Sequence, residues 1–162
     1  MALVTGIDVP AVIVSDMDRS LAFYRDLLGL TVTDKKGVDT GWSDDEEQRW
    51  NAYHEKVCGI PGATIKVVFL AAPNGSQLEL VEYVGAKTAG GPRRPFSAPG
   101  SAIIPFALNN SAATVAALRE AGVDVIADPE PYLLDGVRSN TTYLYDPDDN
   151  VLCLFEIVGN GD

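Results

Sequence analysis

Two distant segments of the sequence repeat one pattern, and this repeat constrains the fold more than any other feature. Residues 9–32 and 103–125 each read as an apolar strand, a polar helix-capping turn, an amphipathic helix, a glycine stop and a second short strand. The two copies also close alike, since QLELVEYV at 77–84 resembles VLCLFEIV at 151–158. Such a duplication predicts two similar units with a shared cavity between them.

The first copy predicts a strand, a helix and three further strands. Ser15 or Asp16 caps the helix and Gly29 stops it, while the first strand is expected to be buried on both faces. Acidic residues 44–47 suit the N-terminal end of a second helix that reaches Val57. The predicted elements are strand 9–14, helix 16–28, strand 30–33, loop 34–48, helix 44–57 and strands 63–72 and 77–84.

The second copy repeats this order without the additional helix. Its predicted elements are strand 102–108, helix 111–121, strand 123–127, a loop through Pro129 and Pro131, and strands 138–145 and 151–158. Residues 85–100 are rich in Gly and Pro and predict a linker, in which Arg93 and Arg94 are expected to be solvated. We therefore predict an α+β fold with βαβββ units at 1–84 and 101–162.

Composition excludes several classes of protein. The net charge of −11 argues against nucleic acid and anionic membranes as partners. No stretch approaches the roughly 18 apolar residues that span a bilayer, and the N-terminus lacks the pattern of a signal peptide. Two cysteines, Cys58 and Cys153, make no disulfide framework, which predicts a cytoplasmic location. The glycine-bearing turns have no phosphate-loop or dinucleotide spacing, so no nucleotide cofactor is indicated.

SDMDRSLAFYRDLLGL at 15–30, the repeated βαβββ unit and DPDDNVLCLFE at 146–156 together resemble the vicinal oxygen chelate superfamily. That superfamily includes glyoxalase I, extradiol dioxygenases and bleomycin-binding proteins. The resemblance covers nearly the whole chain. It implies that each unit curls a mixed sheet into half a barrel, that the two halves enclose a central cup, and that the protein forms a homodimer.

The resemblance also implies where a metal ion would bind. Metal-using members place a His on the first strand and a Glu or Gln on the last strand of each unit. The corresponding positions here are Val9, Glu79, Ile103 and Cys153. Valine and isoleucine have no lone pairs, and one carboxylate with one thiol does not make a hard-metal site. The sequence therefore predicts a protein without a metal ion.

Glu79 is the strongest candidate for metal-independent chemistry. A lone carboxylate that faces an apolar cup has its pKa raised by desolvation, which suits a general acid or base. Alternatively, Glu79 only shapes the pocket through hydrogen bonds. Period-two spacing places Val81 and Tyr83 on the face of Glu79, with Cys153 and Phe155 lining the second half. Cys153 is a weak candidate for a nucleophile, since nothing near it in sequence supplies a cation.

His54 is the second candidate for proton transfer, because histidine is the side chain whose ordinary pKa lies nearest neutrality. Trp50 and Tyr53 on the same helix have two alternative roles. They either pack the helix against the protein or form a lid that stacks on a flat ligand, and Trp42 would belong to the same lid. The residues predicted to line the ligand pocket are Val9, Ala11, Trp50, Val81, Tyr83, Ile103, Pro105, Cys153 and Phe155.

Three functions follow from this sequence. The first is a metal-independent enzyme of isomerase, lyase or cyclase type that acts on a small organic molecule through Glu79 or His54. The second is a non-catalytic protein that sequesters a small molecule, as bleomycin-binding members do. The third, a metal-dependent lyase or dioxygenase, is disfavoured by Val9, Ile103 and Cys153. The sequence does not identify the ligand or show whether His54 reaches the cup.

Overall fold

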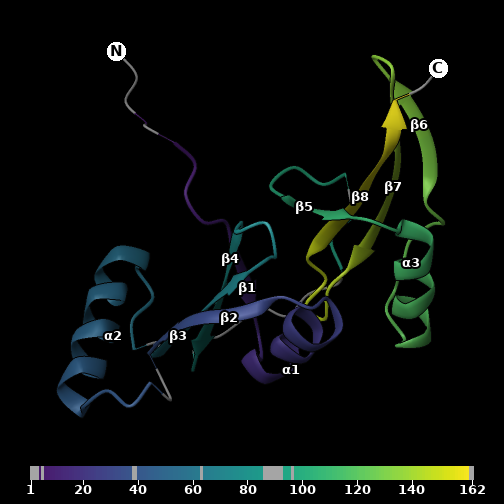
Figure 1. The fold of residues 1–162 in the computed structure, drawn as a ribbon. Coiled ribbons are helices and arrows are strands. Elements are labelled where there is room, and N and C mark those ends of the chain that lie inside the picture. The colour runs from purple at the N-terminus through teal and green to yellow at the C-terminus, as the bar shows by residue number, and fades with distance from the viewer. Residues whose placement is uncertain are drawn as a thin grey trace. The chain divides into compact units, whose positions relative to one another are not determined.

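The computed structural model describes residues 4, 6–37, 40–62, 64–85, 93–95 and 97–160. The chain divides into two compact units, Met1–Gly90 and Gly91–Asp162, and each contains one four-stranded sheet (Figure 1). Part of the predicted linker, at 86–92 and 96, lies outside the described residues. No helix in the described part of the chain is long and apolar enough to cross a membrane.

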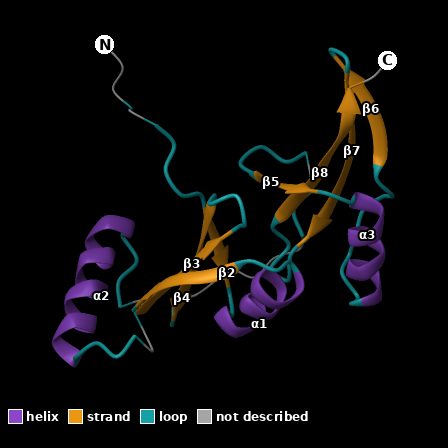
Figure 2. Ribbon diagram, in the orientation of Figure 1, coloured by secondary structure: helices purple, strands orange, loops and turns teal. Residues whose placement is uncertain are grey.

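The first unit is a mixed sheet with helices on both of its faces. Its strands follow the spatial order β1-β4-β3-β2, with β1 parallel to β4 and the other neighbours antiparallel. Figure 2 shows the sheet between α1 on one side and α2 on the other. The elements are β1 (Ala11–Val14), α1 (Met17–Leu21), the π-helical continuation η1 (Ala22–Leu27), β2 (Thr31–Lys36), α2 (Asp44–Cys58), β3 (Thr64–Ala71) and β4 (Gln77–Val84).

The second unit repeats this topology with a single helix. Its strand order, β5-β8-β7-β6, again places the first strand parallel to the last. The elements are β5 (Ile103–Leu108), α3 (Ser111–Glu120), β6 (Glu130–Leu134), β7 (Val137–Tyr145) and β8 (Val151–Asn160). The predicted α+β class with two tandem βαβββ units is therefore confirmed.

Strand register shows which positions of the two units are equivalent. Ala11 lies opposite Glu79 in the first unit, and Pro105 lies opposite Cys153 in the second. Strand pairing therefore aligns the two sheets in the same way as the two sequence copies, with Glu79 equivalent to Cys153.

The first helix of each unit begins with the same capping arrangement. The carboxylate of Asp16 accepts a hydrogen bond from the backbone N–H of Arg19, and the side-chain oxygen of Asn110 accepts one from Ala113, both at 2.9 Å. The Ser20 hydroxyl donates to the Asp16 carbonyl, as the Thr114 hydroxyl does to the Asn110 carbonyl. The predicted cap at Asp16 is correct, and the helix continues as η1 rather than as a regular α-helix.

A glutamate on the last strand of each unit satisfies the helix N-terminus of that unit. Glu82 accepts from the backbone N–H of Met17 at 3.1 Å. Glu156 accepts from the backbone N–H and the hydroxyl of Ser111 at 3.0 and 2.6 Å. A carboxylate is favoured at this end of a helix, because the first N–H groups lack intrahelical partners and the dipole is positive there.

Each helix that follows a first strand packs on one face of its sheet. In the first unit, successive side chains along β1, β3 and β4 alternate between the face that α1 covers and the opposite face. The buried apolar residues on the α1 side are Val12, Val14, Met17, Leu21, Tyr24, Val68, Leu70, Leu78 and Leu80. The corresponding core of the second unit contains Val115, Leu118, Leu144, Leu152 and Leu154.

Two predictions for the first unit are wrong in detail. The first strand is not buried on both faces, since Val12 and Val14 are buried whereas Ile13 is 51% exposed. The alternation arises because α1 covers one face of β1 and no described element covers the other. Predicted loop 34–48 is also too long, since β2 extends to Lys36, where polar side chains are tolerated on an edge strand.

The prediction of a strand at 123–127 is also wrong. Only an isolated bridge between Val125 and Leu144 forms there, and the edge strand is β6, which contains Pro131. Proline is tolerated because an edge strand leaves half of its backbone N–H groups without a strand partner. The turn at Asp135 and Gly136, with φ of 50° and 79°, is the Asp-Gly signal of a tight hairpin.

Arg93 is exposed, as predicted, and it also makes defined contacts. Its guanidinium lies 3.9 Å from the centre of the Tyr145 ring. It also forms ion pairs with Asp124 and, at 2.7 Å, with Asp149. This part of the predicted linker is therefore held against the second unit.

Candidate functional site

Glu79 lies on the face of the first sheet that α2 covers. Antiparallel pairing sets Glu79 opposite Phe69, Val81 opposite Val67 and Tyr83 opposite Ile65, so these six side chains share one face. Ala11 lies beside Glu79 on the parallel strand β1. Apart from the carboxylate and the phenol, this part of the face is apolar.

Helix α2 is anchored on this face by Trp50 and Asn51. The indole N–H of Trp50 donates to the Ile65 carbonyl at 2.9 Å, and the Asn51 side-chain oxygen accepts from the Ile65 N–H at 3.0 Å. Trp50 also packs against the buried cluster of Ile65, Val67 and Val81. The structure thus supports packing as one role of Trp50, although its half-buried ring keeps a surface open to solvent.

The ring of His54 lies next to Trp50, with ring centroids 4.0 Å apart. Its Nδ1 is 2.9 Å from the Trp50 carbonyl oxygen. Tyr53 meets the same imidazole edge-on at 5.0 Å, and Trp42 meets Trp50 at 5.6 Å. The predicted aromatic cluster is therefore present, with His54 half-buried at its centre.

Tyr83 and Cys58 connect the end of α2 to β4. The Tyr83 hydroxyl donates to the Cys58 sulfur at 3.5 Å. This hydrogen bond, burial and the neighbouring charges of Cys58 and Glu79 together raise the pKa of Tyr83 to about 12. Tyr83 therefore keeps its proton at neutral pH and serves as a hydrogen-bond donor.

Burial raises the pKa of Glu79 above its ordinary value, as expected for a carboxyl on an apolar face. The positive charge of His54 opposes this rise and the negative charge of Asp8 adds to it. These influences mean that His54 and Asp8 lie close enough to Glu79 to affect its ionisation. The first unit thus carries both residues that the sequence nominated for proton transfer, Glu79 on β4 and His54 on α2.

The predicted pocket residues of the second unit share the equivalent face of their own sheet. Pairing of β5 with β8 sets Ile103 beside Val151, Pro105 beside Cys153 and Ala107 beside Phe155. Cys153 is buried, and burial raises the pKa of its thiol, an effect that a hydrogen bond with Tyr143 opposes. A thiol with a raised pKa is a poor nucleophile, so Cys153 behaves as a small apolar residue.

The residues at the four predicted ligand positions do not fit a metal ion. Val9 and Ile103 offer no donor atom, and Cys153 offers a protonated thiol, which leaves Glu79 alone. Among the described residues, no three His, Cys, Asp or Glu side chains gather as a set of metal ligands.

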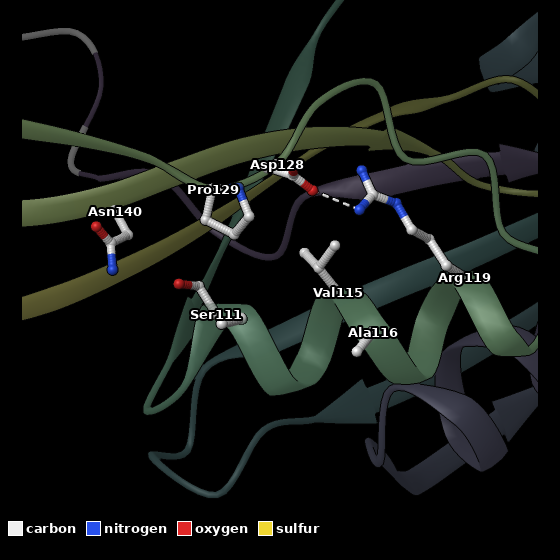
Figure 3. A pocket seen from close by; sticks show the side chains of 8 residues that line it. Ser111, Val115, Ala116, Arg119, Asp128, Pro129 and Asn140 are labelled. Carbon is white, nitrogen blue, oxygen red and sulfur yellow. Dashed lines mark hydrogen bonds and ion pairs between the residues drawn. The ribbon is translucent and has the colours of Figure 1, made fainter.

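A groove of about 350 Å³ lies elsewhere, on the helix side of the second sheet (Figure 3). Figure 3 shows Arg119 and Asp128 paired across it, with Asn140 at one end. None of the predicted site residues lines it; the lining residues are Ser111, Ala112, Val115, Ala116, Arg119, Asp128, Pro129 and Asn140. This groove is therefore distinct from the candidate site.

Sequence reasoning missed Phe69 and Asp8 as neighbours of Glu79. Period-two spacing on β3 could have found Phe69, because the short turn between β3 and β4 fixes its register opposite Glu79. No local signal places Asp8 there, since it precedes β1 and its effect on Glu79 depends on the parallel pairing of β1 with β4.

The sequence matches the model of the glyoxalase/bleomycin resistance protein/dioxygenase superfamily over residues 6–154. No curated protein sequence matches the chain. A glyoxalase family protein from Bacillus cereus has a similar structure, with a TM-score of 0.76, 18% identity and coverage of 98% of this chain and 97% of that one.

Two further solved structures are similar. A glyoxalase/dioxygenase from Nostoc punctiforme has a TM-score of 0.61 and 18% identity, covering 96% of this chain and 92% of that one. The trypanothione-dependent glyoxalase I of Leishmania major has a TM-score of 0.58 and 21% identity, covering 90% and 82%. At these identities the likeness concerns the fold alone.

Proposed function

Because the chain belongs to the glyoxalase/bleomycin resistance protein/dioxygenase superfamily, we propose that it binds a small organic molecule and transfers a proton on it without a metal ion. The observation that carries this proposal is Glu79, a half-buried carboxyl whose pKa is raised by burial on an apolar face. A carboxyl in such a setting titrates closer to neutral pH, where it serves as general acid and general base. The reaction is of the isomerase, lyase or cyclase type.

The residues at the family's ligand positions support the absence of a metal from the mechanism. Three of them provide no anionic or imidazole donor, whereas the fourth, Glu79, is retained. A carboxyl can transfer a proton without a metal ion beside it. Glu79 is therefore proposed as the group that acts directly on the substrate.

Aromatic side chains define the kind of molecule that fits beside Glu79. Phe69, Trp50 and Tyr83 lie on the same face of the sheet as Glu79, and each is half-buried. Part of each side chain therefore packs against the protein, and part stays accessible to a ligand. Flat rings favour planar or apolar ligands through stacking and burial of apolar area. Tyr83 adds a hydroxyl that stays protonated at neutral pH.

Sequestration of a ligand without chemistry is the second candidate. The cluster of Trp42, Trp50, Tyr53 and His54 favours it, because four adjoining rings are suited to stacking on a flat molecule. The net charge of −11 would attract a cationic ligand. The two candidates differ in whether the bound molecule is recovered unchanged.

Tryptophan fluorescence gives a direct test, because Trp50 packs on the face that carries Glu79 and the other tryptophan of the chain, Trp42, lies against Trp50. Protein treated with a chelator is titrated with a panel of small aromatic and carbonyl compounds, and fluorescence identifies those that bind. Bound compounds are then incubated in D₂O and followed by proton NMR for deuterium exchange at carbon.

The decisive variant is Glu79→Gln, with Glu120→Gln on the exposed end of α3 as its matched control. We expect Glu79→Gln to slow exchange by about 10²–10⁴-fold, the usual contribution of general acid–base catalysis, and Glu120→Gln to leave it unchanged. Equal exchange in both variants removes Glu79 from the mechanism. Binding without exchange or turnover favours sequestration, and activity lost on chelation refutes metal independence.

We also propose that the protein is a cytoplasmic homodimer. Both cysteines are free, as is usual in a reducing compartment, and dimers are common in the superfamily that the sequence resembles. Sedimentation equilibrium measures the association directly, and a monomer at micromolar concentration would contradict the proposal.

A further inference from the structure

We propose that the groove of the second unit binds a small organic amine in its ammonium form, at the place where the first unit holds the ammonium of Lys66. The groove is lined by residues of α3, of the segment before β6 and of β7, so this site lies within the second unit. It shares no residue with the site around Glu79 and does not depend on the function proposed there.

Glu82 and Glu156 are equivalent residues of the two units. Each accepts a hydrogen bond from the backbone N–H of the first residue of the helix that follows the first strand of its unit. Strand pairing sets Lys66 opposite Glu82 and Asn140 opposite Glu156. Lys66 and Asn140 therefore occupy equivalent positions as well.

The first unit gives its glutamate a cationic partner, and the second unit does not. The Lys66 ammonium lies 3.5 Å from the Glu82 carboxylate. Asn140 donates an amide N–H to Glu156 at 3.2 Å but brings no charge. Among the described residues, no Lys or Arg side chain forms an ion pair with Glu156. The second unit thus keeps a negative charge where the first unit has an ion pair.

Glu156 is ionised at neutral pH. Hydrogen bonds from the hydroxyl and the N–H of Ser111 and from Asn140 hold its pKa below the ordinary value. Both Glu156 and Asn140 are partly buried, so water and salt screen this charge less than a charge on the open surface. A cation that reaches the carboxylate is therefore attracted to it.

Small side chains leave room for a ligand beside this charge. Ser111 and Asn140 both donate to Glu156, and both line one end of the groove (Figure 3). In the first unit the position of Ser111 is held by Met17, a larger buried side chain. The groove has a volume of about 350 Å³, at the lower end of the roughly 300–1,000 Å³ of small-molecule sites.

The rest of the groove fits the apolar body of such a ligand. Its walls include the side chains of Val115 and Ala116. The charged residues of the lining, Arg119 and Asp128, form an ion pair with each other and add no net charge. The matching ligand is a monocation with an apolar chain or ring, as the lysine side chain itself is.

Asn140 supplies an acceptor for the ammonium. A carboxylate at neutral pH only accepts hydrogen bonds, so the N–H₂ of the Asn140 amide faces Glu156. The amide oxygen accepts no hydrogen bond from the part of the chain that the structure describes. It is left to accept one from an ammonium, which has three N–H donors.

Hexylamine and hexanol test the ligand class, because they share an apolar chain and only the amine is charged at neutral pH. NMR titration of ¹⁵N-labelled protein measures both affinities. We expect hexylamine to bind about 10-fold or more tightly than hexanol, the usual contribution of a charged hydrogen bond. Equal affinities, or no binding of hexylamine, overturn the proposal.

Asn140→Lys is the decisive variant, since it gives the second unit the lysine that the first unit has. We expect the new ammonium to pair with Glu156 and to lower the affinity for hexylamine by about 10-fold or more. Ala117→Lys is the matched control, because it adds the same charge at an exposed residue of α3 that does not line the groove. Binding that persists in Asn140→Lys, or an equal loss in Ala117→Lys, contradicts the site.

Ala116→Phe tests the location of the site without a change in charge. Ala116 is exposed and lines the groove, whereas its neighbour Ala117 is exposed and does not. We expect Ala116→Phe to fill the groove and abolish binding of hexylamine, and Ala117→Phe to leave binding unchanged. Thermal denaturation followed by circular dichroism shows that both variants are folded. Equal affinities of the two folded variants overturn the proposal.

Discussion

The two units share one topology and differ mainly in what connects the third element to the fourth. In the first unit, β2 and β3 are joined by a segment that contains α2, a helix of 15 residues. In the second unit, β6 and β7 are joined by the two-residue turn of Asp135 and Gly136. Among the described residues of the second unit, no helix of that unit covers the face equivalent to the one that α2 covers.

This difference decides the environment of equivalent side chains. Glu79 and Cys153 occupy the same register position, but in the first unit α2 packs Trp50 onto the face that carries Glu79. On the equivalent face of the second sheet, the outer residues Tyr132 and Ile157 remain 62% and 64% exposed.

The largest effect is expected from equivalent core leucines. Leu80 and Leu154 are fully buried on the helix-covered faces of β4 and β8. Truncation to alanine removes buried methyl groups and leaves a cavity, so each variant should lose about 2–5 kcal/mol of unfolding free energy. Urea denaturation measures both losses. If the two units unfold separately, Leu80→Ala moves one transition and Leu154→Ala the other; one shared transition would show that they unfold together.

The next largest effect is expected at Gly37, which precedes the segment that leads to α2. Its φ is +90°, and an added Cβ would lie 2.0 Å from the Ile65 carbonyl oxygen. Gly37→Ala should therefore cost about 3 kcal/mol, because both the backbone and β3 must shift.

Gly29→Ala is the matched control, since its φ of +79° is similar and no atom lies within 4 Å of the added Cβ. It should cost about 1 kcal/mol from the left-handed backbone alone. Thermal denaturation that gave equal losses at both positions would contradict the close approach of Gly37 to β3.

The helix caps should behave as an equivalent pair. Asp16→Ala and Asn110→Ala each remove a side-chain oxygen that accepts a backbone N–H at the start of a helix. Each should cost about 1 kcal/mol of unfolding free energy. Chemical denaturation measures both, and a loss confined to one variant would show that the two helices do not contribute alike.

The smallest effect is expected from Glu156→Gln, since glutamine still accepts hydrogen bonds. Hydrogen bonds from Ser111 and Asn140 hold the pKa of Glu156 below its ordinary value. Its stabilising contribution is therefore fully present above the unfolded-state pKa of about 4.3 and is lost as pH falls through the lower folded-state pKa. The urea midpoint of Glu156→Gln should lie below that of the native protein at pH 7. The two midpoints should converge under acidic conditions, and a constant difference at all pH values would refute this.

Local patterns in the sequence predicted most of the frame. Capping residues, glycine stops and alternating apolar residues located both first helices and the closing strands, because these signals act over one or two turns. The duplication then paired Glu79 with Cys153. The strand at 123–127 was misplaced because β6 depends on pairing with β7, while its own composition, with Pro131, indicates a loop.

The sequence by itself determined the repeated βαβββ order, the equivalence of positions in the two copies, and the apolar side chains of Val9 and Ile103. Only the tertiary structure decided that α2 packs across β3 and β4, and that Nδ1 of His54 lies 2.9 Å from the Trp50 carbonyl oxygen. The reason is physical. Periodicity states which side chains share a face, whereas desolvation and charge interactions depend on which other element covers that face.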